Sequence, residues 1–329
     1  MSETKPFNPE IPKEVDRLFR KLGEMRLPKE PIVPDAGWNY GENRTATASA
    51  VSEWHHFTTD IENLRVHFIH EKAKKREKEA IPLLLMHGWP GTFIEFQNAM
   101  KPLLDPDDKK APVFNLVDTA HIYDVLMKRL GYSAYVALAG DWGHWVVREL
   151  ESGRYDACKA VHTSMCPGAP PTDYMMNAKE QAAIDRAGWW MGTRLNEGHM
   201  LYAISMHTRH QTVGVAFNDN PVGIMMFIGE KYEELADPNL KTATLEDMHF
   251  LNDMCTTLSL YFFTPPSIMT SMLCYYNNVR HEVYTEFNAK EENLIRVLVG
   301  VSMFPYNVFP LPKKGAETTT TNLKFFRGA

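Results

Sequence analysis

Cysteine is scarce in this chain, and long apolar runs are missing from it. The four cysteines, Cys158, Cys166, Cys255 and Cys274, show no spacing typical of a metal site or of a disulfide framework. We therefore expect buried, reduced thiols. No stretch approaches the roughly 20 consecutive apolar residues that a bilayer span needs, and the first residues lack the apolar core of a secretory signal. These absences predict a cytosolic protein without a membrane anchor.

Excess positive charge is missing as well. The chain has 35 Lys and Arg residues against 41 Asp and Glu residues, a formal net charge of −6. Such a chain offers no basic surface to nucleic acid. A hydrophobic content of 44% in 329 residues supplies a sizeable core and favours a main domain with a subdomain. Composition therefore excludes nucleic acid as a partner and allows a homodimer.

The most informative segment is a turn between an apolar run and a helical pattern. Residues 134–138 favour a buried strand, residues 139–143 read Ala-Gly-Asp-Trp-Gly, and residues 144–150 favour a helix. Small residues around one reactive side chain at a strand-to-helix turn are typical of the nucleophile elbow of the α/β-hydrolase fold. The reactive residue here is Asp141. The alternative is that Asp141 only caps the following helix.

A second turn lies upstream of the first. Residues 81–86 predict a buried parallel strand, residues 87–91 read His-Gly-Trp-Pro-Gly, and residues 92–103 have a helical pattern. In the α/β-hydrolase fold such a turn supplies one backbone N–H of the oxyanion hole, and the residue after the nucleophile supplies the other. We therefore assign Trp89 and Trp142 as backbone donors. An ordinary Pro/Gly turn is the alternative for residues 87–91.

These motifs give the chain a family resemblance. The segments 87–91 and 140–143 resemble the microsomal-type epoxide hydrolases, and the similarity extends over most of the chain. It implies an α/β-hydrolase fold with a mostly parallel central sheet, a helical cap and an N-terminal wrapping region. The resemblance places an N-terminal region at 1–60, core halves at 61–164 and 281–329, and the cap at 165–280. Further segments that carry it are 37–41, 56–61, 66–70, 218–223, 228–231, 304–305 and 322–327.

The resemblance also implies chemistry. A carboxylate nucleophile suits attack on saturated carbon, so Asp141 would open an epoxide through an alkyl-ester intermediate. Two cap tyrosines would donate protons to the leaving oxygen, since a phenol is neutral at pH 7. Tyr202 takes the first tyrosine position and Tyr276 the second, with Tyr275 as the alternative to Tyr276. No metal or organic cofactor is required, and the expected partner is a small-molecule epoxide of unidentified class.

The acid and the histidine of the family pattern raise a difficulty. The resemblance places the acid shortly after residues 304–305, where this chain has Asn307. The histidine would follow the segment 325–327 on a Gly-Gly-His loop, and the sequence stops at Ala329. We therefore expect the catalytic histidine to be absent and the second half-reaction to be impaired. His144, His162 and His281 are substitutes only in a rearranged site.

Two further readings of the chain remain. A haloalkane dehalogenase shares the aspartate elbow but does not need the paired tyrosines, and a non-catalytic binder would use the cap pocket without covalent chemistry. Residues 112–117 run into the helical pattern of 118–130 without room for a full strand. Because central parallel strands are buried on both faces, we expect a rearranged sheet edge and lowered stability there.

Overall fold

The computed structural model describes most of the chain in thirteen separate stretches. The described residues are 4–6, 12–24, 54–62, 64–72, 80–96, 107–109, 116–151, 154–168, 170–192, 199–235, 248–263, 267–281 and 294–328. The predicted segment 37–41 therefore lies outside them.

The strands are β1 (Lys5–Pro6), β2 (His56–Ile61), β3 (Leu64–Ile69), β4 (Leu83–Met86), β5 (Asp107–Lys109), β6 (Tyr135–Ala139), β7 (Cys158–Thr163), β8 (Leu298–Ser302) and β9 (Leu323–Arg327). The helices are α1 (Pro12–Glu24), η3 (Phe93–Phe96), α3 (Leu116–Arg129), α4 (Asp141–Leu150), α5 (Ala178–Trp190), α6 (Leu201–Phe217), α7 (Pro221–Leu235), α8 (Met248–Phe263), η5 (Ser267–Met269), α9 (Leu273–His281) and α11 (Lys313–Ala316).

A parallel sheet forms the centre of the molecule. Its strand order is β4-β6-β7-β8-β9, and every neighbouring pair is parallel. The pairing of β4 with β6 places Met86 opposite Ala139. Because parallel strands end at the same edge of a sheet, the two turns singled out in the sequence leave the sheet side by side. The predicted α/β-hydrolase fold is confirmed.

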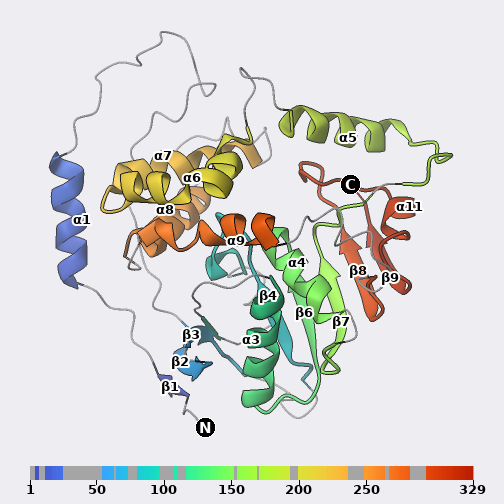
Figure 1. Cartoon of the computed structure of the whole chain (residues 1–329), viewed down its shortest axis with the longest axis horizontal. Coiled ribbons are helices and arrows are strands. Elements are labelled where there is room, and N and C mark those ends of the chain that lie inside the picture. The colour runs from blue at the N-terminus through green and yellow to red at the C-terminus, as the bar shows by residue number, and fades with distance from the viewer. Residues whose placement is uncertain are drawn as a thin grey trace.

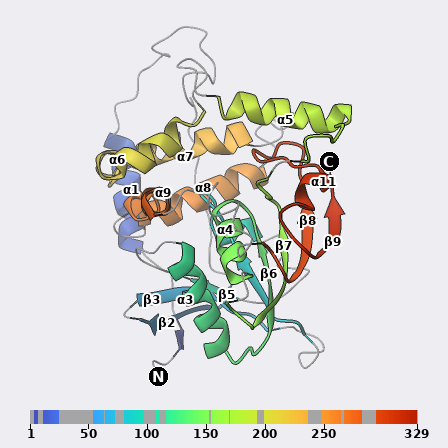
Figure 2. The same cartoon turned by 45° about the vertical axis from the view of Figure 1, so that its right-hand side comes forward.

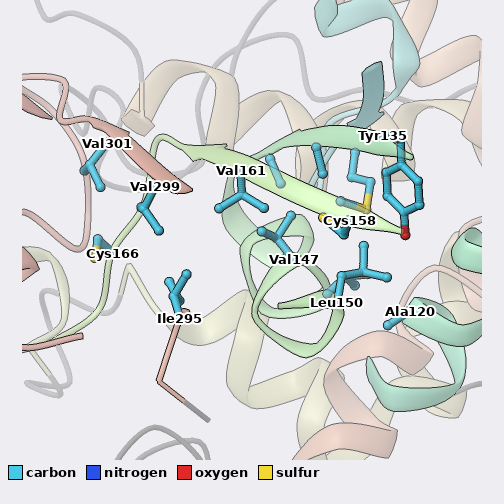
Figure 3. Packing of buried hydrophobic residues seen from close by; sticks show 14 of the residues in the cluster. Ala120, Tyr135, Val147, Leu150, Cys158, Val161, Cys166, Ile295, Val299 and Val301 are labelled. Carbon is cyan, nitrogen blue, oxygen red and sulfur yellow. The ribbon is translucent and has the colours of Figure 1, made fainter. Parts of the chain in front are cut away.

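The core between this sheet and α4 is mostly aliphatic, with Tyr135, methionines and cysteines among its members. Side chains from β7, β8 and α4 gather there, among them Val161, Val299, Val147 and Leu150 (Figure 3). Each of these four has an exposed fraction of 4% or less. Apolar side chains of the sheet thus supply the packing that fixes α4, and with it the position of Asp141.

The first part of the chain forms a second, antiparallel sheet of order β1-β2-β3-β5. Among the described strands, none joins the two sheets, and β4 is an edge strand of the parallel one. A rearranged sheet edge was expected here, because residues 112–117 leave no room for a full strand. Residues 110–115 lie outside the described part of the chain, and the expected loss of stability stays a prediction.

Helices lie over the edge of the sheet where the two turns emerge, and we call the helices α5 to α9 the cap. Figures 1 and 2 both show α5, α6, α7 and α8 above the strands of the parallel sheet. Ile224 and Ile228 are fully buried in the core of these helices, and Phe227 packs against that core. The cysteines are free, and only Cys274 is partly exposed. The prediction of unpaired thiols is therefore confirmed.

Candidate active site

Asp141 occupies a strained turn between β6 and α4. Its φ of 47° lies in the left-handed region, which is uncommon for a residue with a side chain. Gly140 is the N-cap of α4, so Asp141 is the first helical residue and not the helix cap. A methyl group on Gly88 would overlap the Asp141 side chain, and one on Gly140 would overlap the Ser164 hydroxyl. Glycine is thus required at both positions for the turn to close.

Backbone N–H groups from both predicted donors reach the Asp141 carboxylate. The N–H of Trp89 donates to Oδ1 of Asp141 at 2.7 Å. The N–H of Trp142 donates to the same carboxylate. The two turns therefore bring Trp89 and Trp142 together as the sequence predicts, and they fix the orientation of the carboxylate with groups that carry no net charge.

Burial and these two hydrogen bonds act on the Asp141 pKa in opposite directions. Burial raises the pKa to about 6, because the ionised form loses contact with water, while the N–H groups of Trp142 and Trp89 lower it. At pH 7 the carboxylate is therefore mainly ionised but poorly hydrated. Such a carboxylate is more nucleophilic than one exposed to water.

Two phenols from the cap lie beside the same turn. The ring of Tyr202, on α6, stacks on Trp89 with centroids 5.2 Å apart. The ring of Tyr275, on α9, lies 4.8 Å from Trp142 and 5.9 Å from Tyr202. A hydrogen bond joins the two phenols, and the Trp142 indole N–H donates to Tyr275. Burial, with the charge of Asp141, raises the pKa of both phenols, so both are neutral proton donors at pH 7.

The structure does not bring Tyr276 to this place. Its ring lies against His210, with centroids 4.0 Å apart, whereas Tyr275 is 95% buried between Trp142 and Tyr202. Successive residues of a helix point about 100° apart, so only one of the two can face the elbow. The ring that lies beside the elbow is therefore that of the alternative, Tyr275.

Asn307 lies near the elbow but is engaged by the backbone. Its Nδ2 donates to the carbonyl oxygen of Ser164, and its Oδ1 accepts the N–H of Phe309 at 2.8 Å. Ser164 follows β7 and lies against Gly140. The side chain at the position expected for the family's acid therefore holds the loop after β8.

The histidines weighed as substitutes lie elsewhere. His144 is fully buried, and its Nδ1 is 2.9 Å from the Thr163 hydroxyl. His162 is bonded to the Ser302 hydroxyl at 3.0 Å. The side chain of His281 lies outside the described residues. Within the described part of the chain, no histidine is hydrogen-bonded to Asp141.

Sequence reasoning missed one ionisable neighbour, Glu95. A methyl group on Gly91 would overlap the Glu95 carboxylate, so that carboxylate lies over the turn that carries Trp89. Burial, and secondly the charge of Asp141, raise the pKa of Glu95 to about 8. The sequence gives one signal for this contact, which is that Glu95 stands four residues after Gly91. A short helix between the two brings the Glu95 side chain back over the turn.

The described residues contain neither a cluster of metal-ligating side chains nor a helix suited to crossing a membrane. Among them, no three His, Cys, Asp or Glu side chains gather as metal ligands would. No helix within the described stretches combines the length and apolarity that crossing a membrane requires.

Comparisons with known proteins agree with this geometry. Residues 47–96 match a family model described as the epoxide hydrolase N terminus. The chain is 28% identical to epoxide hydrolase 1 of Sus scrofa, over 94% of this chain and 80% of that protein. It is 27% identical to epoxide hydrolase 1 of Oryctolagus cuniculus, over 95% of this chain and 81% of that one. A solved structure of Aspergillus niger epoxide hydrolase superposes with a TM-score of 0.78 at 27% identity, covering 99% of this chain and 90% of the other.

Proposed function

We propose that this chain, homologous to the epoxide hydrolases, opens an epoxide by attack of Asp141 on a ring carbon. A new bond forms between a carboxylate oxygen and that carbon while the carbon–oxygen bond of the ring breaks. The departing oxygen takes a proton from the phenol pair Tyr202 and Tyr275. The product of this step is an alkyl ester of Asp141 that carries a neighbouring hydroxyl group.

One observation carries the proposal. The ionised carboxylate of Asp141 accepts two backbone N–H groups and lies beside two neutral, hydrogen-bonded phenols. This arrangement places a nucleophile beside proton donors within a cluster of packed aromatic and aliphatic side chains. It suits an electrophile that is apolar and needs its leaving oxygen protonated, which describes an epoxide better than a haloalkane, since a halide leaves without a proton.

Release of the product needs water to attack the ester carbonyl of Asp141. The backbone N–H groups of Trp89 and Trp142 would then stabilise the negative charge on the carbonyl oxygen in the tetrahedral intermediate. Breakdown of this intermediate frees a vicinal diol and leaves Asp141 as a carboxyl group, whose proton then returns to the phenol that was deprotonated in the first step. The proposed steps use no metal or organic cofactor, and foreign epoxides, lipid epoxides and intermediates of specialised metabolism all fit the proposal.

Intact mass after incubation with styrene oxide tests the proposal. We expect an adduct of one epoxide per chain, assigned to the peptide that contains Asp141, and no adduct on Asp141→Asn. Asp185→Asn is the matched control, because Asp185 lies exposed on α5, where it accepts from Gln181. Ligand-induced stabilisation without an adduct, retained in Asp141→Asn, would favour a non-catalytic binder. Halide release from a haloalkane without reaction on the epoxide would favour the dehalogenase.

A further inference from the structure

Lys231 of α7 is a buried cation in the cap. Its side chain is 1% exposed, although a lysine is almost never fully buried unless it is paired. The ammonium group donates to Oε2 of Glu234 at 2.6 Å and to the carbonyl oxygen of His199 at 3.4 Å, and it is ion-paired with Glu230. Replacing a buried ion pair with apolar side chains often leaves a protein as stable as before or more stable. Stability alone therefore does not account for a buried charge at this place.

The ammonium group lies over the ring of the phenol Tyr202. Nζ of Lys231 is 5.0 Å from the ring centroid, within the roughly 6 Å at which a cation and an aromatic face attract each other. The same ring stacks on Trp89, with centroids 5.2 Å apart and planes 8° from parallel. The N–H of Trp89 in turn donates to Oδ1 of Asp141 at 2.7 Å. Direct contacts thus connect Lys231 to the proposed nucleophile through a proposed proton donor.

Opening of the epoxide moves a negative charge through this group of residues. A carboxylate oxygen of Asp141 forms a bond to the ring carbon, and the electron pair of the broken carbon–oxygen bond stays on the departing oxygen. A phenol proton goes to that oxygen, and the electron pair of the O–H bond stays on the phenol. The negative charge has then left Asp141 and appeared on a phenol. The rate therefore depends on how well the surroundings stabilise a phenolate.

We propose that Lys231 is a positioning residue that makes Tyr202 the proton donor of the phenol pair. The inference rests on the proposed function. A phenolate spreads its negative charge into the ring, so an ammonium group 5.0 Å from the centroid attracts the phenolate more strongly than it attracts the neutral phenol. This attraction grows as the proton leaves, which lowers the barrier to ring opening. Glu230 and Glu234 hold the ammonium group in this place.

The two phenols differ in the groups that face them. The ring of Tyr275 faces the imidazole of His207, with centroids 5.4 Å apart. Burial lowers the pKa of His207, so this imidazole is neutral at pH 7. Tyr202 has the ammonium group of Lys231 beside it instead. The hydrogen bond between the phenols acts in the same direction, because it lowers the pKa of Tyr202 against the larger, raising effect of burial.

Rapid-quench mass spectrometry with styrene oxide at pH 8 measures the rate of adduct formation in the full chain. We expect Lys231→Met to slow it about 10- to 30-fold, the effect of a desolvated cation beside an aromatic ring. The loss should fall on the maximal rate and not on the epoxide concentration that gives half of it, because the bound epoxide does not yet carry the charge that Lys231 stabilises. Lys128→Met is the matched control, since Lys128 of α3 is paired with the buried Asp124, outside the cap.

Combination with the phenol variants separates this role from a structural one. In a Tyr202→Phe background we expect Lys231→Met to change the rate less than about threefold, because no phenolate forms beside the ammonium group. In a Tyr275→Phe background the loss of about 10- to 30-fold should persist. An equal loss in all three backgrounds, or no loss in the parent, would overturn the role of Lys231. An adduct absent from the parent chain would instead overturn the proposed function itself.

Glu234→Gln tests the inference should Lys231→Met fail to fold. The substitution breaks the same ion pair and leaves Glu230 to hold the ammonium group. It also removes a charge that raises the pKa of Tyr202, after burial and the charge of Asp141. We expect adduct formation to become about two- to tenfold faster, because one charge that opposes the phenolate is gone. A rate that is unchanged or lower would show that the ion pair only holds α7 in place, and the inference would be wrong.

Discussion

The two ends of α4 both bury charged groups, and they do so in different ways. At the first residue, the carboxylate of Asp141 is held by backbone N–H groups and lies beside phenols. At the other end, Arg148 and the C-cap residue Glu151 are fully buried and attract each other. A carboxylate held by backbone N–H groups stays available for reaction, whereas, within the described part of the chain, the side-chain oxygens of Glu151 accept no hydrogen bond and Glu151 serves the fold.

The pKa shifts follow the same division. Burial raises the pKa of Glu151 well above its ordinary range, and Arg148 opposes this shift. Burial also lowers the pKa of Arg148. Asp141 has no basic group among the causes of its shift, so its ionised form depends on the two N–H donors alone. Perturbed pKa values therefore occur at both ends of the helix. The candidate site differs from the other end because hydrogen-bond donors gather around the Asp141 carboxylate.

Removing the phenols should give the largest effect on the chemistry. We expect Tyr202→Phe combined with Tyr275→Phe to slow adduct formation by about 10²- to 10⁴-fold, because no proton donor then meets the departing oxygen. Rapid-quench mass spectrometry measures this rate. Tyr276→Phe is the matched control, since the structure turns Tyr276 toward His210. A larger loss in Tyr276→Phe than in Tyr275→Phe would reverse the assignment of the two neighbours.

Removing the charge of Arg148, near the C-terminal end of α4, should lower the stability of the fold and not the rate of adduct formation. We expect Arg148→Met to lower the free energy of unfolding by about 1–3 kcal/mol, because the buried Glu151 loses the nearby positive charge that opposes its burial and keeps no hydrogen-bond partner among the described residues. Urea unfolding measures the loss. Arg65→Met, which breaks an exposed ion pair with Asp60, should cost less than about 1 kcal/mol. The comparison between the two ends fails if Arg148→Met instead blocks adduct formation in a chain of unchanged stability.

The pH dependence of adduct formation should follow the ionisation of Asp141 and not that of the charged groups at the C-terminal end of α4. Because the raised pKa of Asp141 is about 6, the rate should fall about tenfold per pH unit below pH 6, as the carboxylate is protonated. Single-turnover rates between pH 4.5 and pH 8 test this. A midpoint near the usual pKa of an aspartate would show that water hydrates the carboxylate fully.

The smallest expected effect is a gain in stability. The folded-state pKa of Asp141 is raised, so ionisation costs stability as the pH rises toward and above 6, and the cost is absent below the unfolded pKa. We expect Asp141→Asn to raise the free energy of unfolding by about 1–2 kcal/mol at pH 8 and to change it little at pH 4, after a discount for partial exposure of the residue. Equal gains at both pH values would contradict the burial of this charge.

Local sequence predicted the elbow because its parts are adjacent along the chain. The apolar run, the glycines and Asp141 together specify a buried strand, a sharp turn and a helix. The second turn was predictable for the same reason, and the parallel register of Met86 with Ala139 brings the two together. The fold class and the donors Trp89 and Trp142 were accessible from these patterns and from the family resemblance.

Features that depend on how distant elements pack against one another could not be predicted from the sequence. The choice between Tyr275 and Tyr276 depends on the rotation of α9 over the elbow, which the packing of the cap decides. The role of Asn307 in holding Ser164 depends on how the loop after β8 meets the end of β7. Glu95 was missed because its carboxylate gains meaning only from the position of Asp141, 46 residues later in the chain.

The two indole rings beside the elbow have a practical consequence. Trp89 and Trp142 each donate a backbone N–H to the Asp141 carboxylate, and their rings contact Tyr202 and Tyr275. Conversion of that carboxylate into an ester removes a negative charge next to two native fluorophores. The intrinsic emission of the unlabelled protein should therefore change as the covalent state forms and return as it is lost, giving a continuous optical record of turnover without a modified substrate.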